Sequence, residues 1–105
     1  MKKIGIITCY NESKQYPGIN CFNAFNNRTA SFKDYDSESV VLGFVHCNGC
    51  SKDSAELVLQ RAKKMKETGV DVIHLSTCMK KMCPRYKEHL NALSNDFEVA
   101  EYTHD

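Results

Sequence analysis

Cysteine is the residue type in this chain whose number and spacing point to chemistry. The 105 residues include six cysteines. Three of them directly follow apolar runs that are typical of strands. The six are Cys9, Cys21, Cys47, Cys50, Cys78 and Cys83. The carboxyl ends of parallel strands meet at one edge of a sheet, and open α/β sheets bind ligands at that edge. We therefore expect a metal-binding or redox site there.

The segment Cys47-Asn48-Gly49-Cys50 is a CxxC motif. Two intervening residues let both sulfurs turn toward one point, as in zinc knuckles and dithiol redox centres. Gly49 supplies the backbone torsions of a tight turn, and the free N–H groups of a following helix favour thiolate over thiol. Together with Cys9 and Cys78 at neighbouring predicted strand ends, the motif predicts a cluster of thiolates.

Distance favours Cys9, Cys47, Cys50 and Cys78 as the first set of metal ligands. Adjacent strands lie about 4.8 Å apart, so three strand ends span about 10 Å. Zinc–sulfur bonds of about 2.3 Å need sulfurs within roughly 4 Å of each other, which converging side chains can reach. Zinc suits such a sulfur-rich tetrahedral site, and Cu(I) or an iron–sulfur cluster are alternatives.

Three more side chains are candidate ligands at the same edge. Cys21 lies in the first turn of a predicted helix, and Cys83 follows Cys78 by five residues. Either could replace a member of the first set or help hold a second ion. His104 follows the last predicted strand and could supply an imidazole, although it lies two residues from an end expected to fray.

The remaining histidines are expected to be structural or exposed. His46 and His74 lie inside predicted strands, where a buried imidazole is normally hydrogen-bonded. His89 lies beside the apolar face of the last predicted helix and is expected at the surface.

A thiol–disulfide or reductase-type enzyme is the alternative function, with Cys47 as nucleophile and Cys50 as resolving thiol. A strand, a CxxC and a helix in succession are what such redox motifs share. Dithiol enzymes need only two cysteines, however, and no proline near Thr77-Cys78 stands in for the cis-proline of thioredoxin-like sites. A metal site with three ligands and a water could also be catalytic, but no carboxylate is evidently placed as its general base. Metal binding is therefore the favoured hypothesis.

The elements that must position these residues alternate between strand and helix. We expect a short helix opening at Pro17-Gly18, a second helix capped by Ser51 or Asp53 and ending at Gly69, and a last helix from Pro84. Residues 11–16 read as a polar loop. Strands are expected at residues 3–8, 40–46, 70–77 and, more weakly, 97–102.

This alternation predicts a three-layer α/β domain with a four-stranded parallel sheet, similar to flavodoxin-like or Rossmann-like folds. The simplest strand order is 2-1-3-4, which puts the topological switch between the first and third strands. The second strand is a near-continuous apolar run of the kind that is buried on both faces. The helix after Pro17-Gly18 carries Ile19, Phe22 and Phe25 at helical spacing.

Size and charge exclude several classes of function. The length fits one domain over residues 1–105. The net charge of +1, from 14 basic and 13 acidic residues, gives no electrostatic case for nucleic acid or a membrane. Residues 9–13 lack the glycines of a phosphate loop, so no nucleotide is predicted. With no signal peptide or long apolar segment evident, we expect a cytoplasmic protein, in which thiols stay reduced.

The pattern resembles the CGGC-domain family, which is described as metal-binding. The resemblance rests on residues 3–9, on Pro17-Gly18-Ile-Asn-Cys21, on Gly43-Phe-Val-His-Cys47-Asn48-Gly49-Cys50, on residues 71–78 and on Thr103-His104. It implies that all six cysteines and His104 are candidate ligands. Asn48 replaces the first glycine of the signature, and Cys83-Pro84-Arg85 stands where the family often has Cys-Pro-His. The interval between Cys78 and Cys83 is also short for the family.

Overall fold

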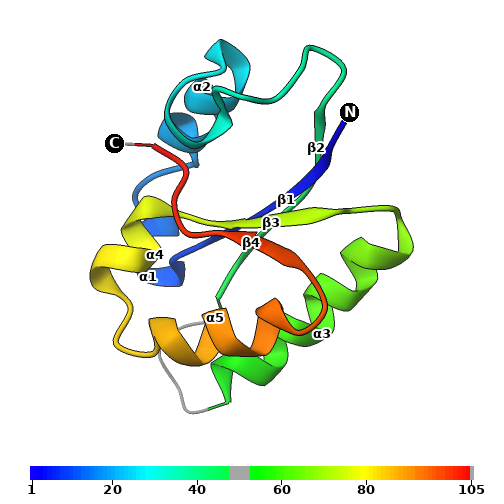
Figure 1. Cartoon of the computed structure of the whole chain (residues 1–105). Helices are drawn as coiled ribbons and strands as arrows, with labels where there is room; N and C mark the ends of the chain where they lie inside the picture. Colours follow the sequence, from blue (N-terminus) through cyan, green and yellow to red (C-terminus); the bar gives the residue numbers. More distant parts are fainter. Residues whose placement is uncertain (48–52, 105) are drawn as a thin grey trace.

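Four parallel strands form the sheet at the centre of the molecule, in the order β2-β1-β3-β4 (Figure 1). The structure is a computed structural model that describes residues 1–47 and 53–104. Every neighbouring pair of strands is parallel. The strands are β1 (Lys3–Thr8), β2 (Val40–His46), β3 (Val72–Leu75) and β4 (Glu98–Ala100). The predicted α/β fold and strand order are therefore confirmed.

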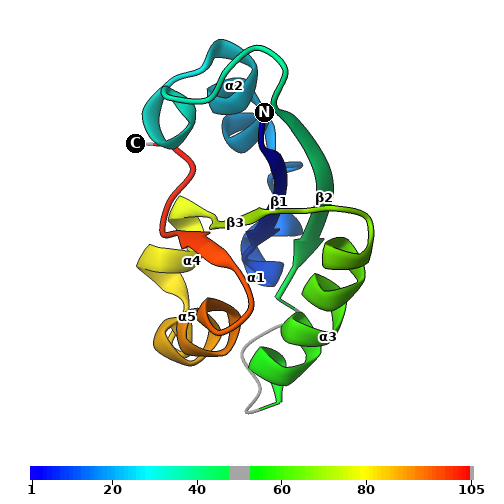
Figure 2. The same cartoon turned by 45° about the vertical axis from the view of Figure 1, so that its right-hand side comes forward.

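Helices cover both faces of this sheet, which gives three layers (Figures 1 and 2). One face is covered by α3 (Ser54–Glu67) and α5 (Tyr86–Ser94), and the other by α2 (Ile19–Asn27) and the 3-10 turn η1 (Ala30–Phe32). Two short helices, α1 (Tyr10–Ser13) and α4 (Thr77–Met82), follow the carboxyl ends of β1 and β3. None of the helices in the described ranges is long and apolar enough to cross a bilayer.

Helix α3 packs closely on the sheet because two glycines make room for it. Gly5 and Gly43 are paired across β1 and β2. A Cβ atom at Gly5 would lie 2.7 Å from the Met65 sulfur, and one at Gly43 would lie 2.9 Å from it. Gly69 then ends the helix with a φ of +104°, the left-handed conformation that glycine adopts without strain.

The opposite face is built around a buried histidine. The His74 ring stacks on Phe32 at 4.4 Å between centroids. Its Nδ1 lies 3.0 Å from the Tyr102 carbonyl oxygen, and its Nε2 lies 2.7 Å from the Tyr35 hydroxyl. Burial lowers the pKa of His74, so the neutral imidazole donates to the carbonyl and accepts from the hydroxyl. Through its contact with the Tyr102 carbonyl oxygen, the His74 ring holds the chain just before Thr103 and His104.

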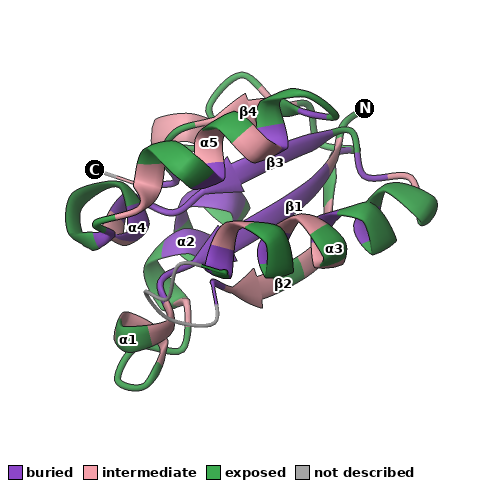
Figure 3. Ribbon diagram, turned by 90° about the horizontal axis from the view of Figure 1, so that it is seen from below, coloured by how far each residue is buried: buried purple, intermediate pink, exposed green. Residues whose placement is uncertain are grey.

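The expectation that β2 is buried on both faces is wrong. Val40, Leu42 and Phe44 are 40%, 48% and 38% exposed, because β2 is an edge strand with only β1 beside it. Figure 3 shows this contrast between a buried β1 and an only partly buried β2. Helix α2 buries Cys21, Ala24 and Phe25, whereas Ile19 at its first position is exposed.

His89 is not at the surface as expected but fully buried. Helices α3 and α5 pack against each other, and the His89 Nε2 lies 3.2 Å from the Ser54 hydroxyl at the start of α3. The His89 Nδ1 is buried without a hydrogen-bond partner. Burial lowers the pKa of His89, which keeps the ring neutral in this position.

Candidate thiol site

Cys9 and Cys47 follow the ends of the neighbouring strands β1 and β2, as the sequence predicted. The strand register aligns Thr8 with His46, and the Cys47 N–H donates to the Thr8 carbonyl at 2.9 Å, so the pairing continues one residue further. The Tyr10 N–H donates to the Cys47 Sγ at 3.3 Å. Cys9 is 3% exposed and Cys47 has no exposed surface, so this pair is closed to solvent.

Cys78 does not close a strand, contrary to the sequence prediction. Strand β3 ends at Leu75 because Ser76 caps the short helix α4: its hydroxyl accepts the Met79 N–H at 3.2 Å. Cys78 therefore lies in the first turn of α4. Its Sγ is 3.0 Å from the Ser76 hydroxyl and 3.5 Å from the Thr8 hydroxyl. This helix still places the thiol at the end of β1.

Electrostatics links Cys78 to the first pair. Burial raises the pKa of the Cys9 thiol, the N–H groups of Glu12 and Asn11 oppose that rise, and negative charge on Cys47 or Cys78 raises the pKa further. Thiolates at all three positions would therefore repel one another. A bound cation would remove that repulsion.

Cys21 reaches the same region from the other side of the sheet. It lies on α2, is 4% exposed, and its Sγ is 3.2 Å from the Thr103 hydroxyl. Burial raises the pKa of Cys21, the Thr103 hydroxyl opposes that rise, and charge on Cys78 adds to it. Thr103 thus lies between two cysteine-bearing segments, because its hydroxyl also accepts the Thr77 N–H at 3.3 Å.

The carboxyl-terminal segment is held in place rather than frayed. The N–H groups of Thr103 and His104 donate to the Thr77 hydroxyl oxygen at 3.2 Å and 3.0 Å. The Thr77 hydroxyl in turn donates to the His104 carbonyl. The contact between Thr77 and Thr103 could not be predicted from the sequence. Two threonines 26 residues apart carry no sequence pattern that would identify them as partners.

Cys83 and Cys50 are the remaining candidate cysteines. Cys83 ends α4, is 9% exposed, and belongs to the apolar cluster that also contains Cys9 and Cys47. Cys50, together with the rest of segment 48–52, lies outside the described residues. The five described cysteines form no disulfide with one another.

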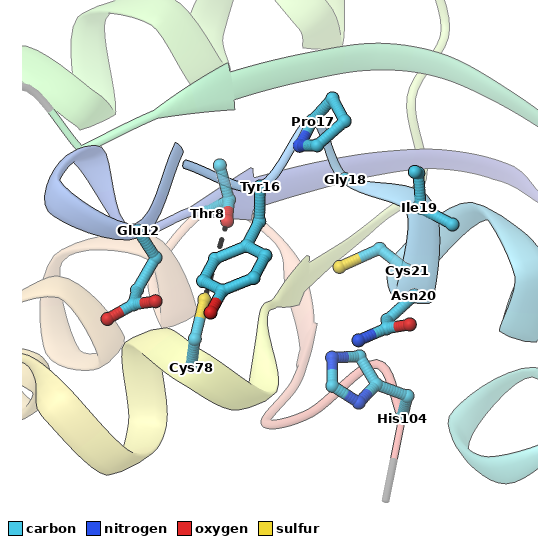
Figure 4. A pocket seen from close by; sticks show the side chains of 10 residues that line it. All are labelled: Thr8, Glu12, Tyr16, Pro17, Gly18, Ile19, Asn20, Cys21, Cys78 and His104. Carbon is cyan, nitrogen blue, oxygen red and sulfur yellow. Dashed lines mark hydrogen bonds between the residues drawn. The ribbon is translucent and has the colours of Figure 1, made fainter. Parts of the chain in front are cut away.

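A cavity of about 400 Å³ opens beside Cys78, between the end of β1, the start of α2 and the carboxyl-terminal segment (Figure 4). It lies between the ends of β1 and β3, at the predicted topological switch. Cys78 and Cys21 approach it from different elements, and the His104 ring lies near Cys21. Its lining includes Thr8, Glu12, Tyr16, Cys21, Cys78 and His104.

The donor chemistry of the edge suits a soft metal, although its side chains are not gathered around one point. Within residues 1–47 and 53–104, no three His, Cys, Asp or Glu side chains lie close enough together to hold a metal ion. Metal binding would therefore require side chains of this edge to move or residues outside the described ranges to take part.

A family model described as the CGGC domain matches residues 3–104, nearly the whole chain. The chain belongs to the CGGC domain family. The signature of this CGGC domain is Cys47-Asn48-Gly49-Cys50, with asparagine at its second position. Membership of the family suggests a metal-binding role. A search of curated proteins and a search of solved structures found no match.

Proposed function

We propose that this protein binds zinc through cysteine thiolates at the carboxyl-terminal edge of its sheet. The ligands are Cys9, Cys47 and Cys78, with Cys50 as the fourth ligand inferred from the sequence. The observation that carries the proposal is the placement of three thiols at one edge of the sheet, where thiolates would repel one another: Cys9 and Cys47 follow the ends of β1 and β2, and the Cys78 Sγ lies 3.5 Å from the Thr8 hydroxyl at the end of β1. A divalent cation converts that repulsion into attraction.

Zinc is the metal that this donor set suits best. Thiolates are soft ligands, and zinc takes four of them in a tetrahedral structural site without any redox change. Cu(I) and iron–sulfur clusters use the same ligand type. These two alternatives differ from zinc in redox behaviour and in the metal present, so elemental analysis of the purified protein separates them.

Polar groups around the sulfurs support thiolate ligands. The Tyr10 N–H already donates to the Cys47 Sγ, and the Ser76 and Thr8 hydroxyls flank the Cys78 Sγ. Such donors stabilise negative charge on sulfur and orient it, as outer-shell groups do in metal sites.

Zinc binding would be coupled to local ordering of the edge. The described thiols are not gathered around one point, so binding includes the free energy of bringing them together. Binding energy of this kind becomes folding energy. We therefore expect zinc to raise the melting temperature of the protein.

The alternative enzyme function, with Cys47 as attacking thiol, has less support. Cys47 has no exposed surface, and a thiol must reach its disulfide substrate to attack it. Burial of this kind suits a ligand inside a closed site better than a nucleophile.

Elemental analysis of anaerobically purified protein tests the proposal. The expected result is about one zinc per chain, which is removed by a chelator and restored by added zinc. Less than about one tenth of an equivalent of any transition metal, with all thiols shown to be free, would contradict metal binding. Stoichiometric copper or iron would replace zinc by one of the named alternatives.

A further inference from the structure

The cavity beside Cys78 carries a second kind of thiol chemistry. It lies where open α/β sheets bind ligands, between the ends of two strands whose following helices pack on opposite faces. Its volume of about 400 Å³ falls within the range of small-molecule sites. Its lining contains two cysteines, Cys21 and Cys78.

These two cysteines differ in access. Cys78 is the partly exposed member of the described cysteines, whereas Cys21 is 4% exposed. A molecule that enters the cavity therefore meets the Cys78 sulfur first. Cys21 can act only after the reaction partner is held in place.

The surroundings of Cys78 favour attack by its sulfur. The Ser76 hydroxyl oxygen accepts the Met79 N–H at 3.2 Å, which leaves the hydroxyl hydrogen available for the Cys78 Sγ at 3.0 Å. The Thr8 hydroxyl approaches the same sulfur from β1 (Figure 4). Hydroxyl donors stabilise the negative charge of an attacking thiolate.

A single hydroxyl group, that of Thr103, links Cys21 to the segment that carries Cys78. Its Sγ contacts the Thr103 hydroxyl at 3.2 Å, and the same hydroxyl accepts the N–H of Thr77, the residue before Cys78, at 3.3 Å. Both thiols therefore line one cavity, on segments that the Thr103 hydroxyl joins.

We propose that the cavity is the binding site of a small uncharged disulfide, which Cys78 attacks and Cys21 resolves. Pro17, Gly18 and Ile19 give the cavity largely apolar walls, and the Glu12 carboxylate at its rim disfavours an anionic ligand. A neutral disulfide with an apolar or aromatic group fits these walls. The reaction does not depend on zinc binding, and it belongs to the metal-free protein because a zinc ion would occupy Cys78.

The reaction balances in two exchange steps. The Cys78 thiol loses its proton, and the resulting thiolate attacks one sulfur of the disulfide to form a mixed disulfide. The first half of the disulfide leaves as a thiolate and takes up that proton. The Cys21 sulfur then attacks the Cys78 sulfur and releases the second half as a thiol. Two electrons pass from the protein to the disulfide, and an external dithiol restores the reduced pair.

Dipyridyl disulfide, which is small, neutral and aromatic, is a suitable probe. Reduced protein is first treated with a chelator and then mixed with less than one equivalent of dipyridyl disulfide. The expected result is release of both pyridine thiols from each molecule consumed, with a Cys21–Cys78 disulfide found by peptide mapping. Cys21→Ser should release one of them and keep the other on Cys78. Cys78→Ser should consume the probe at least about tenfold more slowly.

Two further variants keep the test informative if a cysteine variant folds poorly. Thr8→Val keeps both thiols and removes one hydroxyl beside Cys78, so it should slow the first release severalfold without changing the disulfide formed. Cys83→Ser, outside the cavity, should leave both rates unchanged. A stable pyridyl adduct on Cys78 of the wild-type protein, or an undiminished rate in Cys78→Ser, would overturn the proposal.

Discussion

Two pairs of cysteines meet at one edge of the sheet and differ in their surroundings. Cys9 and Cys47 follow adjacent strands and are closed off by the packing of α3 and α5. Cys21 and Cys78 come from α2 and α4 and line a cavity. The residue type is the same in both pairs. Access to solvent assigns them different chemistry: a ligand must be oriented, whereas a nucleophile must be reached.

Cys78 belongs to both groups, which makes it the point where they compete. Its Sγ lies 3.5 Å from the Thr8 hydroxyl, at the strand end that precedes Cys9, and it lines the same cavity as Cys21. Zinc bound to Cys78 would prevent its thiol–disulfide exchange in the cavity. A Cys21–Cys78 disulfide would in turn remove a zinc ligand. The comparison therefore predicts that oxidation releases the metal.

Replacing one cysteine of each pair by serine is expected to give the largest effects. Cys47→Ser should lose stoichiometric zinc, with a fall in affinity beyond the about 10–100-fold cost of losing an outer-shell partner. It should still form the Cys21–Cys78 disulfide. Cys21→Ser should keep zinc and lose the disulfide. Metal analysis and peptide mapping of both variants check this, and identical behaviour of the two would remove the distinction between the pairs.

A smaller effect is expected from acid, which lowers the stability of the folded chain. This loss limits the pH range in which the two cysteine pairs can be compared. Burial lowers the pKa values of His74 and His89 in the folded chain. The unfolded chain, with pKa values near about 6.5, therefore binds more protons below that pH. Stability should therefore fall as the pH drops below about 6.5. Urea unfolding of the metal-free protein at several pH values measures this, and an unchanged midpoint down to pH 5 would contradict it.

The smallest expected effect concerns the hydroxyl that joins the cavity cysteines to the carboxyl-terminal segment. Thr103→Val removes the group that contacts Cys21 and accepts the Thr77 N–H. We expect a loss of about 1 kcal/mol in the free energy of unfolding, with zinc content unchanged. Thr103→Ser keeps the hydroxyl and is the matched control. A loss of zinc in Thr103→Val alone would mean that the cavity side supports the metal.

Much of the fold followed from hydrophobic patterning. The apolar runs of β1 and β2 gave the strands, and their alternation with helices gave a parallel sheet in the observed order. The exposure of Val40, Leu42 and Phe44 could not be read from the run itself. Whether an apolar strand is buried on both faces depends on its place in the sheet and on the helices above it, which are properties of the assembled domain.

The candidate site was predictable in part for similar reasons. The positions of Cys9 and Cys47 followed from strand ends and parallel register. Helix α4 was missed because a serine cap and a single turn make a weak pattern. The hydrogen bonds between Thr103 and Thr77 join residues that are distant in sequence. They depend on the pairing of β4 with β3, which is a property of the folded chain.

Cobalt substitution tests the central claim most directly, because Co²⁺ takes the same tetrahedral thiolate sites as zinc and absorbs visible light. Reduced, metal-free protein is titrated with Co²⁺ and then with Zn²⁺. The account predicts intense tetrahedral absorption with sulfur-to-metal charge transfer that saturates at about one equivalent and is abolished by zinc. A spectrum that stays that of octahedral aqueous cobalt, while all thiols titrate as free, would contradict it.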